Sequence, residues 1–218
     1  MITVAIARTN IGQDSNKENL LDYIDKDIYT ILPNTAGCFK ADEAVRVAMI
    51  ARELLETNLL KLEVLLDKKS LLPNESETLK AAEKLVKENF SVMVYTTQNI
   101  QLAKDLENIG CDAIMPLGSQ IGTGQGIKTP SNIRKIIEKA NVPVIVDAGI
   151  RTPSDASLAM EMGCEAVLLN TSIAESKNPI KMAEAMKYAV KAGRLSYVAK
   201  AMKIKDEASP SSDKNSLL

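Results

Sequence analysis

Residues 58–66 read Asn-Leu-Leu-Lys-Leu-Glu-Val-Leu-Leu, a short apolar run that carries two charged side chains, Lys61 and Glu63. A run of this length and composition predicts a buried strand over residues 59–65. Similar apolar, β-branched runs recur along the chain and predict further strands at Ile2–Ala7, Tyr29–Leu32, Ser91–Tyr95, Ala113–Pro116, Val142–Ala148 and Ala166–Asn170.

The segments between these runs have apolar residues at helical spacing. They predict helices over Ala41–Leu55, Glu75–Glu88, Gln98–Ile109, Ser131–Ala140, Ser154–Met162 and Pro179–Ala201. Alternating strands and helices predict a parallel sheet covered by helices. About seven strand–helix units are visible, and a spacing of roughly 20–30 residues per unit favours an α/β fold of the (β/α)8 TIM-barrel type. Because periodicity does not show closure, an open doubly wound sheet is the alternative.

Composition places the chain among soluble globular proteins. Its 218 residues are 45% hydrophobic and 25% charged, with a net charge of −1. We expect a single domain at residues 1–202 and a polar tail at residues 203–218, either disordered or folded over the site or onto a partner. The sequence lacks a basic block, a signal peptide and the roughly 20-residue apolar run of a membrane helix, so we expect neither nucleic-acid nor membrane binding. The expected location is the cytoplasm, or the plastid stroma for a plastid-encoded chain.

The reactive side chains limit the available chemistry. The chain has no histidine and three cysteines, Cys38, Cys111 and Cys164, without the spacing of a zinc site. The absence of histidine excludes Ser-His-Asp triads, Cys-His pairs and histidine-based metal sites. We expect three buried thiols in a reducing compartment and no bound metal. Acid–base chemistry then falls to Asp, Glu, Lys, Tyr or Cys.

Lys61 and Glu63 occupy alternate positions of the predicted strand, so their side chains share one face. Leu59 and Leu65 lie on the same face, which is therefore expected to point into the barrel. A buried lysine is costly unless it is paired or used. Desolvation would lower the pKa of Lys61 and free its amine to form an imine, with Glu63 moving protons at the adjacent carbon. The alternative is a structural ion pair.

Asp147 ends the predicted strand in VPVIVDAG, residues 142–149. Carboxylates at the C-terminal ends of barrel strands face the active-site mouth, so Asp147 is a second acid–base candidate, although it could instead orient the following turn. The segment Gly118–Gly126 is rich in glycine and has Gly122 at its centre. Such glycines let backbone N–H groups approach an anion closely, whereas a flexible surface loop is the alternative.

The last two predicted strands lead into Ala148-Gly149 and Asn170-Thr171. In many β/α barrels the loops after these strands bind phosphate through backbone amides and helix N-termini. Loops that only turn the chain are the alternative. An amine inside the barrel beside a phosphate site would suit a ketone that carries a phosphate, such as a phosphosugar.

Several blocks together resemble the thiazole synthase family of thiamine biosynthesis. They include ILPNTAGCFKADEAVRVA (31–48), LLKLEVL (59–65), IMPLGSQIGTGQGI (114–127) and VPVIVDAGI (142–150), and the resemblance runs in order from about Ile2 to Ala199. It implies an eight-stranded β/α barrel that uses no metal and no organic cofactor.

The resemblance also implies a reaction and its partners. The family condenses 1-deoxy-D-xylulose 5-phosphate, dehydroglycine (2-iminoacetate) and sulfur from the thiocarboxylate of a ubiquitin-like sulfur-carrier protein into a thiazole phosphate. It further implies a homo-oligomer, a tetramer, and a complex with the dehydroglycine-forming enzyme. Carried over residue by residue, the imine-forming lysine falls on Lys61 and the acid–base carboxylates on Glu63 and Asp147. The phosphosugar contacts fall on Gly122, Ala148, Gly149, Asn170 and Thr171.

The chain departs from the family pattern in two places. The family's first strand–helix unit, with its Leu-Gly-Thr-Gly-like turn, has no counterpart here, and Arg151 replaces a glycine beside the expected phosphate site. The leading hypothesis is an active synthase. The alternatives are a non-catalytic remnant that binds the phosphosugar or the carrier protein, and a lysine aldolase on a similar barrel.

Overall fold

Parallel strands form the centre of the computed structural model, which describes residues 1–12 and 14–211. In this part of the chain the strands are β1 (Ile2–Ala5), β2 (Ile31–Asn34), β3 (Leu59–Leu62), β4 (Ser91–Thr96), β5 (Ala113–Pro116), β6 (Ile145–Asp147) and β7 (Ala166–Leu168). Strands β1 to β5 pair in sequence order, and every pair is parallel. Single bridges from Ile114 to Val144 and from Leu117 to Asp147 connect β5 with β6, which pairs with β7.

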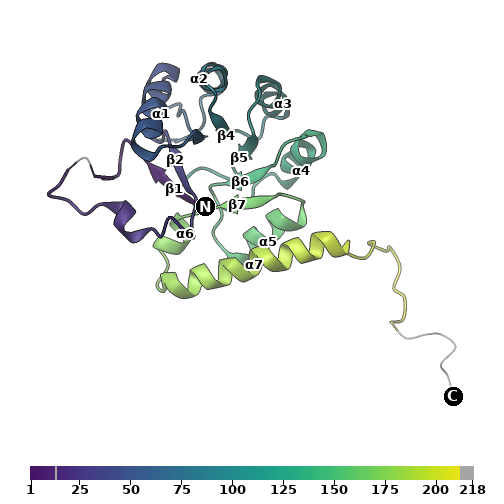
Figure 1. Ribbon diagram of the computed structural model, residues 1–218. Coiled ribbons are helices and arrows are strands. Elements are labelled where there is room, and N and C mark those ends of the chain that lie inside the picture. The colour runs from purple at the N-terminus through teal and green to yellow at the C-terminus, as the bar shows by residue number, and fades with distance from the viewer. Residues whose placement is uncertain (13, 212–218) are drawn as a thin grey trace.

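Helices surround these strands on the outside (Figure 1). They are α1 (Ala41–Leu55), α2 (Glu75–Lys87), α3 (Ile100–Ile109), α4 (Pro130–Lys139), α5 (Pro153–Glu161), α6 (Thr171–Ala174) and α7 (Pro179–Ala199), with a 3-10 turn at Leu20–Tyr23. The arrangement confirms the predicted α/β fold of barrel type with seven visible strands. Among the described residues no backbone pairing joins β7 to β1, so the expected eighth strand has no counterpart between them.

The predicted helices all form, and their ends lie within two residues of the expected positions. The strand predictions were less accurate. Strands β1, β3 and β6 are shorter than the predicted segments Ile2–Ala7, Leu59–Leu65 and Val142–Ala148. Strand β2 covers Ile31–Asn34 rather than Tyr29–Leu32, and β7 ends at Leu168 rather than at Asn170, just before the short helix α6. The polar tail carries no helix or strand over residues 203–211, while the rest of the predicted tail, residues 212–218, lies outside the described residues.

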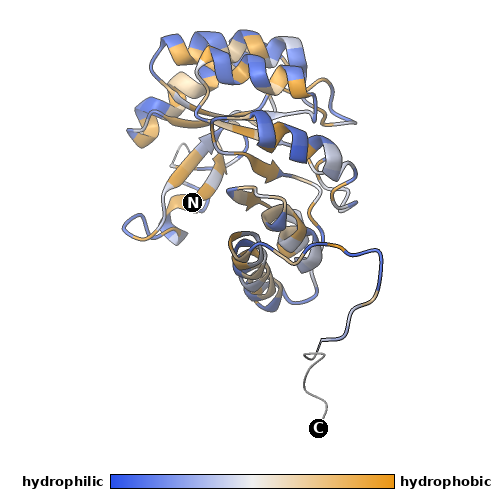
Figure 2. Ribbon diagram, turned by 90° about the vertical axis from the view of Figure 1, so that its right-hand side faces the viewer, coloured by the Kyte–Doolittle hydropathy of each residue, from blue (hydrophilic) through white to orange (hydrophobic). Residues whose placement is uncertain are grey.

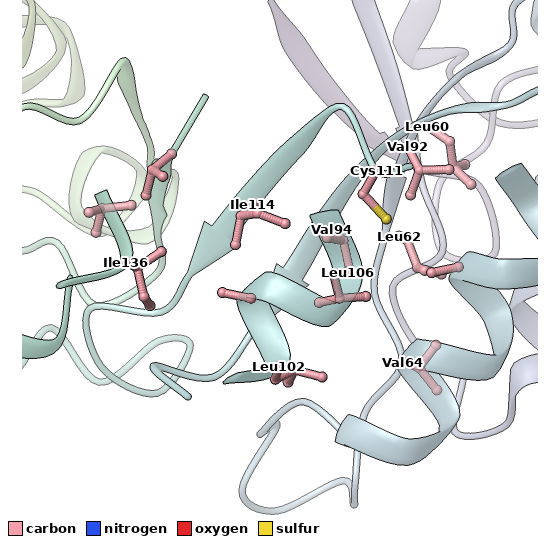
Figure 3. Close-up of a cluster of buried hydrophobic side chains, with 14 of the residues drawn as sticks. Leu60, Leu62, Val64, Val92, Val94, Leu102, Leu106, Cys111, Ile114 and Ile136 are labelled. Atoms are coloured by element: carbon pink, nitrogen blue, oxygen red, sulfur yellow. The ribbon is translucent and has the colours of Figure 1, made fainter. Parts of the chain in front are cut away.

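The main core lies between the strands and the outer helices (Figure 3). Leu60, Leu62 and Val64 project from the β3 segment into this layer and are fully buried against residues such as Leu85 and Leu106. Figure 2 shows the same division, with apolar colours along the strands and mixed colours on the helices. Burial of one leucine side chain contributes roughly 1.5–3 kcal/mol to folding. Because side chains alternate along a strand, the neighbours of these residues, Lys61 and Glu63, point to the opposite face.

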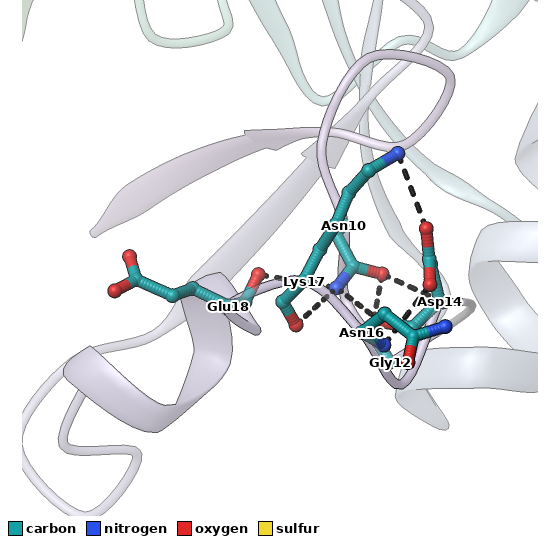
Figure 4. Close-up of polar contacts among 6 residues, drawn as sticks. All are labelled: Asn10, Gly12, Asp14, Asn16, Lys17 and Glu18. Carbon is teal, nitrogen blue, oxygen red and sulfur yellow. Dashed lines mark hydrogen bonds and ion pairs between the residues drawn. The ribbon is translucent and has the colours of Figure 1, made fainter.

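The long connection after β1 is held together by one side chain, Asn10 (Figure 4). Its amide nitrogen donates to the carbonyl oxygens of Asp14, Lys17 and Glu18 at 3.0–3.1 Å, and its amide oxygen accepts from Gly12 and Asp14. These bonds tie residues 10–12 to residues 14–18 of the connection. Within residues 1–12 and 14–211, no helix has the length and apolarity needed to cross a membrane.

Candidate active site

A cavity of about 660 Å³ opens at the C-terminal ends of the strands. It brings together every residue that the sequence analysis proposed for the site: Lys61, Glu63, Asp147, Gly122, Ala148, Gly149, Asn170 and Thr171. These residues come from β3 and the residue directly after it, from β6, from the loops after β5, β6 and β7, and from the first residue of α6. Their common position follows from the parallel sheet, because the C-terminal ends of parallel strands meet at one edge. Their chemical roles stay predictions.

Three buried charged groups form the centre of the cavity. The Lys61 ammonium nitrogen lies 2.6 Å from Asp147 Oδ2 and 3.6 Å from Glu63 Oε2. Each of these side chains is at most 6% exposed. Lys61 therefore points into the barrel, as the strand alternation predicted, and is not turned toward bulk solvent.

The pKa of Lys61 is shifted in the opposite direction from the one expected from the sequence. Burial lowers the pKa of Lys61, but the charges of Asp147 and then Glu63 outweigh that effect, and the pKa is raised above its usual value. The prediction of a lowered pKa is wrong because two carboxylates lie close to one amine. Burial raises the pKa of Glu63 and of Asp147, and the charge of Lys61 only partly opposes the shift.

Thr35 fixes the position of Glu63, and the sequence analysis missed it. The Thr35 hydroxyl accepts a hydrogen bond from the Glu63 backbone N–H and donates one to the Glu63 carbonyl oxygen, both at 2.8 Å. Thr35 is fully buried in the loop after β2, the strand that pairs with β3. A small hydroxyl at a strand end carries no motif, so the fold is needed to find this contact.

The ring of Tyr95 lies next to the Lys61 amine. Its centroid lies 5.4 Å from the Lys61 nitrogen, and the residue is fully buried on β4. Burial, with the charges of Asp147 and Glu63, raises the pKa of the Tyr95 phenol, so the group stays neutral. An aromatic face at this distance stabilises a cation, which adds to the preference of Lys61 for its charged form.

The other end of the cavity is built mainly from backbone. Gly149 has φ +80°, and a Cβ there would come within 2.4 Å of the Ser119 backbone nitrogen, so no larger residue fits. Ala148 beside it also has a positive φ, +66°. Gly122, at φ +76°, faces open space. Exposed backbone with little side-chain cover is the environment that small anions such as phosphate prefer.

Comparison with known proteins identifies the family. The sequence model described as thiazole biosynthesis protein ThiG matches residues 1–213. The chain belongs to the ThiG family. Thiazole synthase from Pseudomonas aeruginosa strain LESB58 is 59% identical over 219 residues, which span all of this chain and 83% of that protein. The thiazole synthase of Stutzerimonas stutzeri strain A1501 is 58% identical over the same shares.

A solved structure supports the same family assignment. The chain superposes on one from the Amycolatopsis orientalis BexX/CysO complex with a TM-score of 0.82 and 30% identity, covering 94% of this chain and 84% of that one. Membership in ThiG makes the chain an enzyme of thiazole formation in thiamine biosynthesis. It also argues against the lysine-aldolase alternative.

Proposed function

We propose that this ThiG protein condenses 1-deoxy-D-xylulose 5-phosphate, dehydroglycine and sulfur from a carrier-protein thiocarboxylate through an imine on Lys61. The observation that carries the proposal is the Lys61 amine, 5% exposed and held 2.6 Å from Asp147 in the cavity that also contains the glycine-rich end. A ketose phosphate placed in this cavity would have its phosphate near Gly122 and Gly149 and its ketone near the amine.

The first step requires the amine to lose a proton. Because the pKa of Lys61 is raised, its resting form is the ammonium ion. Asp147 is the nearest acceptor, and its own raised pKa lets it hold the transferred proton. The free amine then adds to the ketone carbon, the carbon–nitrogen double bond forms, and the former ketone oxygen leaves as water.

Later steps require proton transfer at the carbons beside the imine. Glu63 is placed for this role because it lies on the same face of β3 as Lys61 and its backbone is clamped by Thr35. The carbonyl moves along the carbon chain, the thiocarboxylate delivers sulfur, and dehydroglycine closes the ring. The protein contributes position and proton transfer, each of which accelerates reactions by orders of magnitude.

A protein partner is part of this proposal. The similar Amycolatopsis orientalis structure is a complex of two proteins, BexX and CysO, which supports a protein partner for this chain as well. We propose a ubiquitin-like sulfur carrier in that place. The homo-oligomeric state, the tetramer and the complex with the dehydroglycine-forming enzyme stay predictions.

Turnover tests the proposal. Incubation of the wild-type chain with the sugar phosphate, dehydroglycine and carrier thiocarboxylate is expected to yield the thiazole phosphate, detected by mass spectrometry. Lys61→Ala and Lys61→Arg are expected to abolish it, and the arginine variant keeps the buried positive charge without an imine-forming amine. Lys135→Ala changes an exposed lysine of α4 and serves as the matched control. Product from either Lys61 variant would contradict the imine, and no product from the wild type would favour the non-catalytic alternative.

A further inference from the structure

Arg8 contributes to two neighbouring cavities. The residue follows the end of β1 and lines both the 660 Å³ cavity and a smaller neighbouring one of about 470 Å³. None of the proposed catalytic steps uses it. Among the described residues, no carboxylate lies within ion-pair distance of its guanidinium group.

The surrounding backbone leaves room for this side chain. A Cβ at Gly37, which has φ +99°, would lie 3.0 Å from Arg8 Nε, so the absence of a side chain at Gly37 lets the guanidinium lie against the backbone. The Arg8 backbone N–H donates to the Ala5 carbonyl oxygen at 3.0 Å, and the chain beyond is closed by Asn10 (Figure 4). Arg8 is thus held in a turn, and no carboxylate of residues 1–12 and 14–211 pairs with its charged end.

Arg8 lies on the β2 side of the amine, because its guanidinium group approaches Gly37 in the loop after β2, and β2 pairs with β3, the strand that carries Lys61. The positive charge of Arg8 acts to lower the pKa of Glu63, while Lys61 is the cation that acts on Asp147. The glycine-rich end lies on the other side, because Ala148 and Gly149 directly follow Asp147. That end has a cation of its own, Arg151, whose stem packs over Gly124. The cavity therefore offers two separate places for anions, with the amine between them.

We propose that Arg8 binds the carboxylate of dehydroglycine and so selects a small carboxylate as the second substrate. This inference rests on the proposed function. The sugar phosphate places its single anionic group at the glycine-rich end, which leaves the Arg8 end for a different anion. A guanidinium group matches a carboxylate with two parallel hydrogen bonds, whereas an ammonium group offers a point charge. That no carboxylate of the described residues pairs with Arg8 is consistent with a partner that arrives from solution.

Binding of oxamate tests this assignment without turnover. Oxamate is a two-carbon carboxylate that resembles dehydroglycine and does not condense with an amine. Calorimetry is expected to show binding to the wild-type protein, a Kd at least ~10-fold weaker for Arg8→Gln, and an intermediate value for Arg8→Lys. Arg134→Gln removes an exposed arginine of α4 and is expected to leave the Kd unchanged. Equal Kd values for the wild type and Arg8→Gln, or no binding to the wild type, would overturn the proposal.

Kinetic constants show whether Arg8 binds dehydroglycine or the carrier thiocarboxylate. Dehydroglycine can be generated from glyoxylate and ammonium, and Arg8→Gln is expected to raise its KM while the KM for the carrier thiocarboxylate stays the same. A rise in the carrier KM alone would instead assign Arg8 to the carrier and overturn the proposal. Borohydride trapping of the sugar phosphate on Lys61 should be equal in the wild-type protein and the Arg8→Gln variant. Failure of that trapping in the wild type would refute the proposed function independently of the oxamate result.

Discussion

At the scale of single residues, burial and the neighbouring carboxylates act in opposite directions on the pKa of Lys61. An isolated buried ammonium group would lose its proton, yet Lys61 keeps a raised pKa because Asp147 and Glu63 lie 2.6 Å and 3.6 Å away. The same burial makes both carboxylates better proton acceptors than they are in water. In the proposed mechanism, this arrangement stores the nucleophile in its inactive form and places the base that activates it in direct contact.

Replacing Asp147 by asparagine tests this balance. The change removes the charge nearest to Lys61, so burial is less opposed and the Lys61 pKa should fall. The free amine then exists at lower pH, and the rising limb of imine formation against pH should move to lower pH. Glu63→Gln should move it in the same direction but less, because Glu63 is farther away. A limb that stays in place or moves to higher pH would contradict the assigned direction.

The same two variants should separate imine formation from later steps. Both are expected to keep imine formation, because one carboxylate beside Lys61 remains in each variant to take its proton. Both should slow overall turnover by roughly 10²- to 10⁴-fold, the range typical of lost acid–base catalysis. The comparison is between borohydride-trapped protein and product formed per unit time. Unchanged turnover in both variants would reject their roles in proton transfer.

The site residues were predictable because their signals are local. Period-two alternation placed Lys61 and Glu63 inside the barrel, and the strand end placed Asp147 and the glycine turns at its mouth. The direction of the Lys61 pKa was not predictable in this way, since it depends on distances between β3 and β6 that no spacing encodes. Thr35, Tyr95 and Arg8 carry no motif, and each gains its meaning from a neighbour far away in sequence.

At the scale of elements, the contact between β2 and β3 holds in place the strand that carries Lys61. Lys61 pairs with Asn34, and Thr35 continues the connection with its two hydrogen bonds to Glu63. The predicted end of β2 was two residues too early, since the stretch contains Pro33 and a sequence window cannot show which residues pair. Helix α6 was missed because its four residues are too few to show helical periodicity.

Thr35→Val should weaken this connection. Valine has nearly the same shape but lacks the hydroxyl, so the Glu63 N–H and carbonyl oxygen lose their partner inside the fold. An unpaired buried polar group costs about 1–3 kcal/mol, and the free energy of unfolding in urea should fall by that order. Thr35→Ser keeps the hydroxyl and should lose about 1 kcal/mol or less. A valine variant as stable as the wild type would show that the clamp is not stabilising.

At the scale of the whole molecule, the three thiols lie inside the fold and outside the lining of the proposed active-site cavity. Cys38, Cys111 and Cys164 are each at most 4% exposed. Burial raises their pKa values to about 11, 12 and 12 respectively. Because thiolates are the reactive form, these residues should be inert in the folded protein.

Thiol titration checks this expectation. At pH 8 the native chain should react slowly with a thiol reagent, and all three cysteines should react at once after unfolding in guanidinium chloride. This result agrees with sulfur being delivered by a carrier rather than by the chain. Rapid reaction of one thiol in the native state would show an open or catalytic cysteine and contradict the buried positions.

The imine on Lys61 is the claim on which the whole account depends. Its most direct test is reduction with borohydride in the presence of 1-deoxy-D-xylulose 5-phosphate, followed by peptide mass spectrometry. The account predicts one covalent sugar phosphate adduct on Lys61, absent from Lys61→Ala. An unmodified wild-type peptide, or an adduct that persists in the alanine variant, would contradict it.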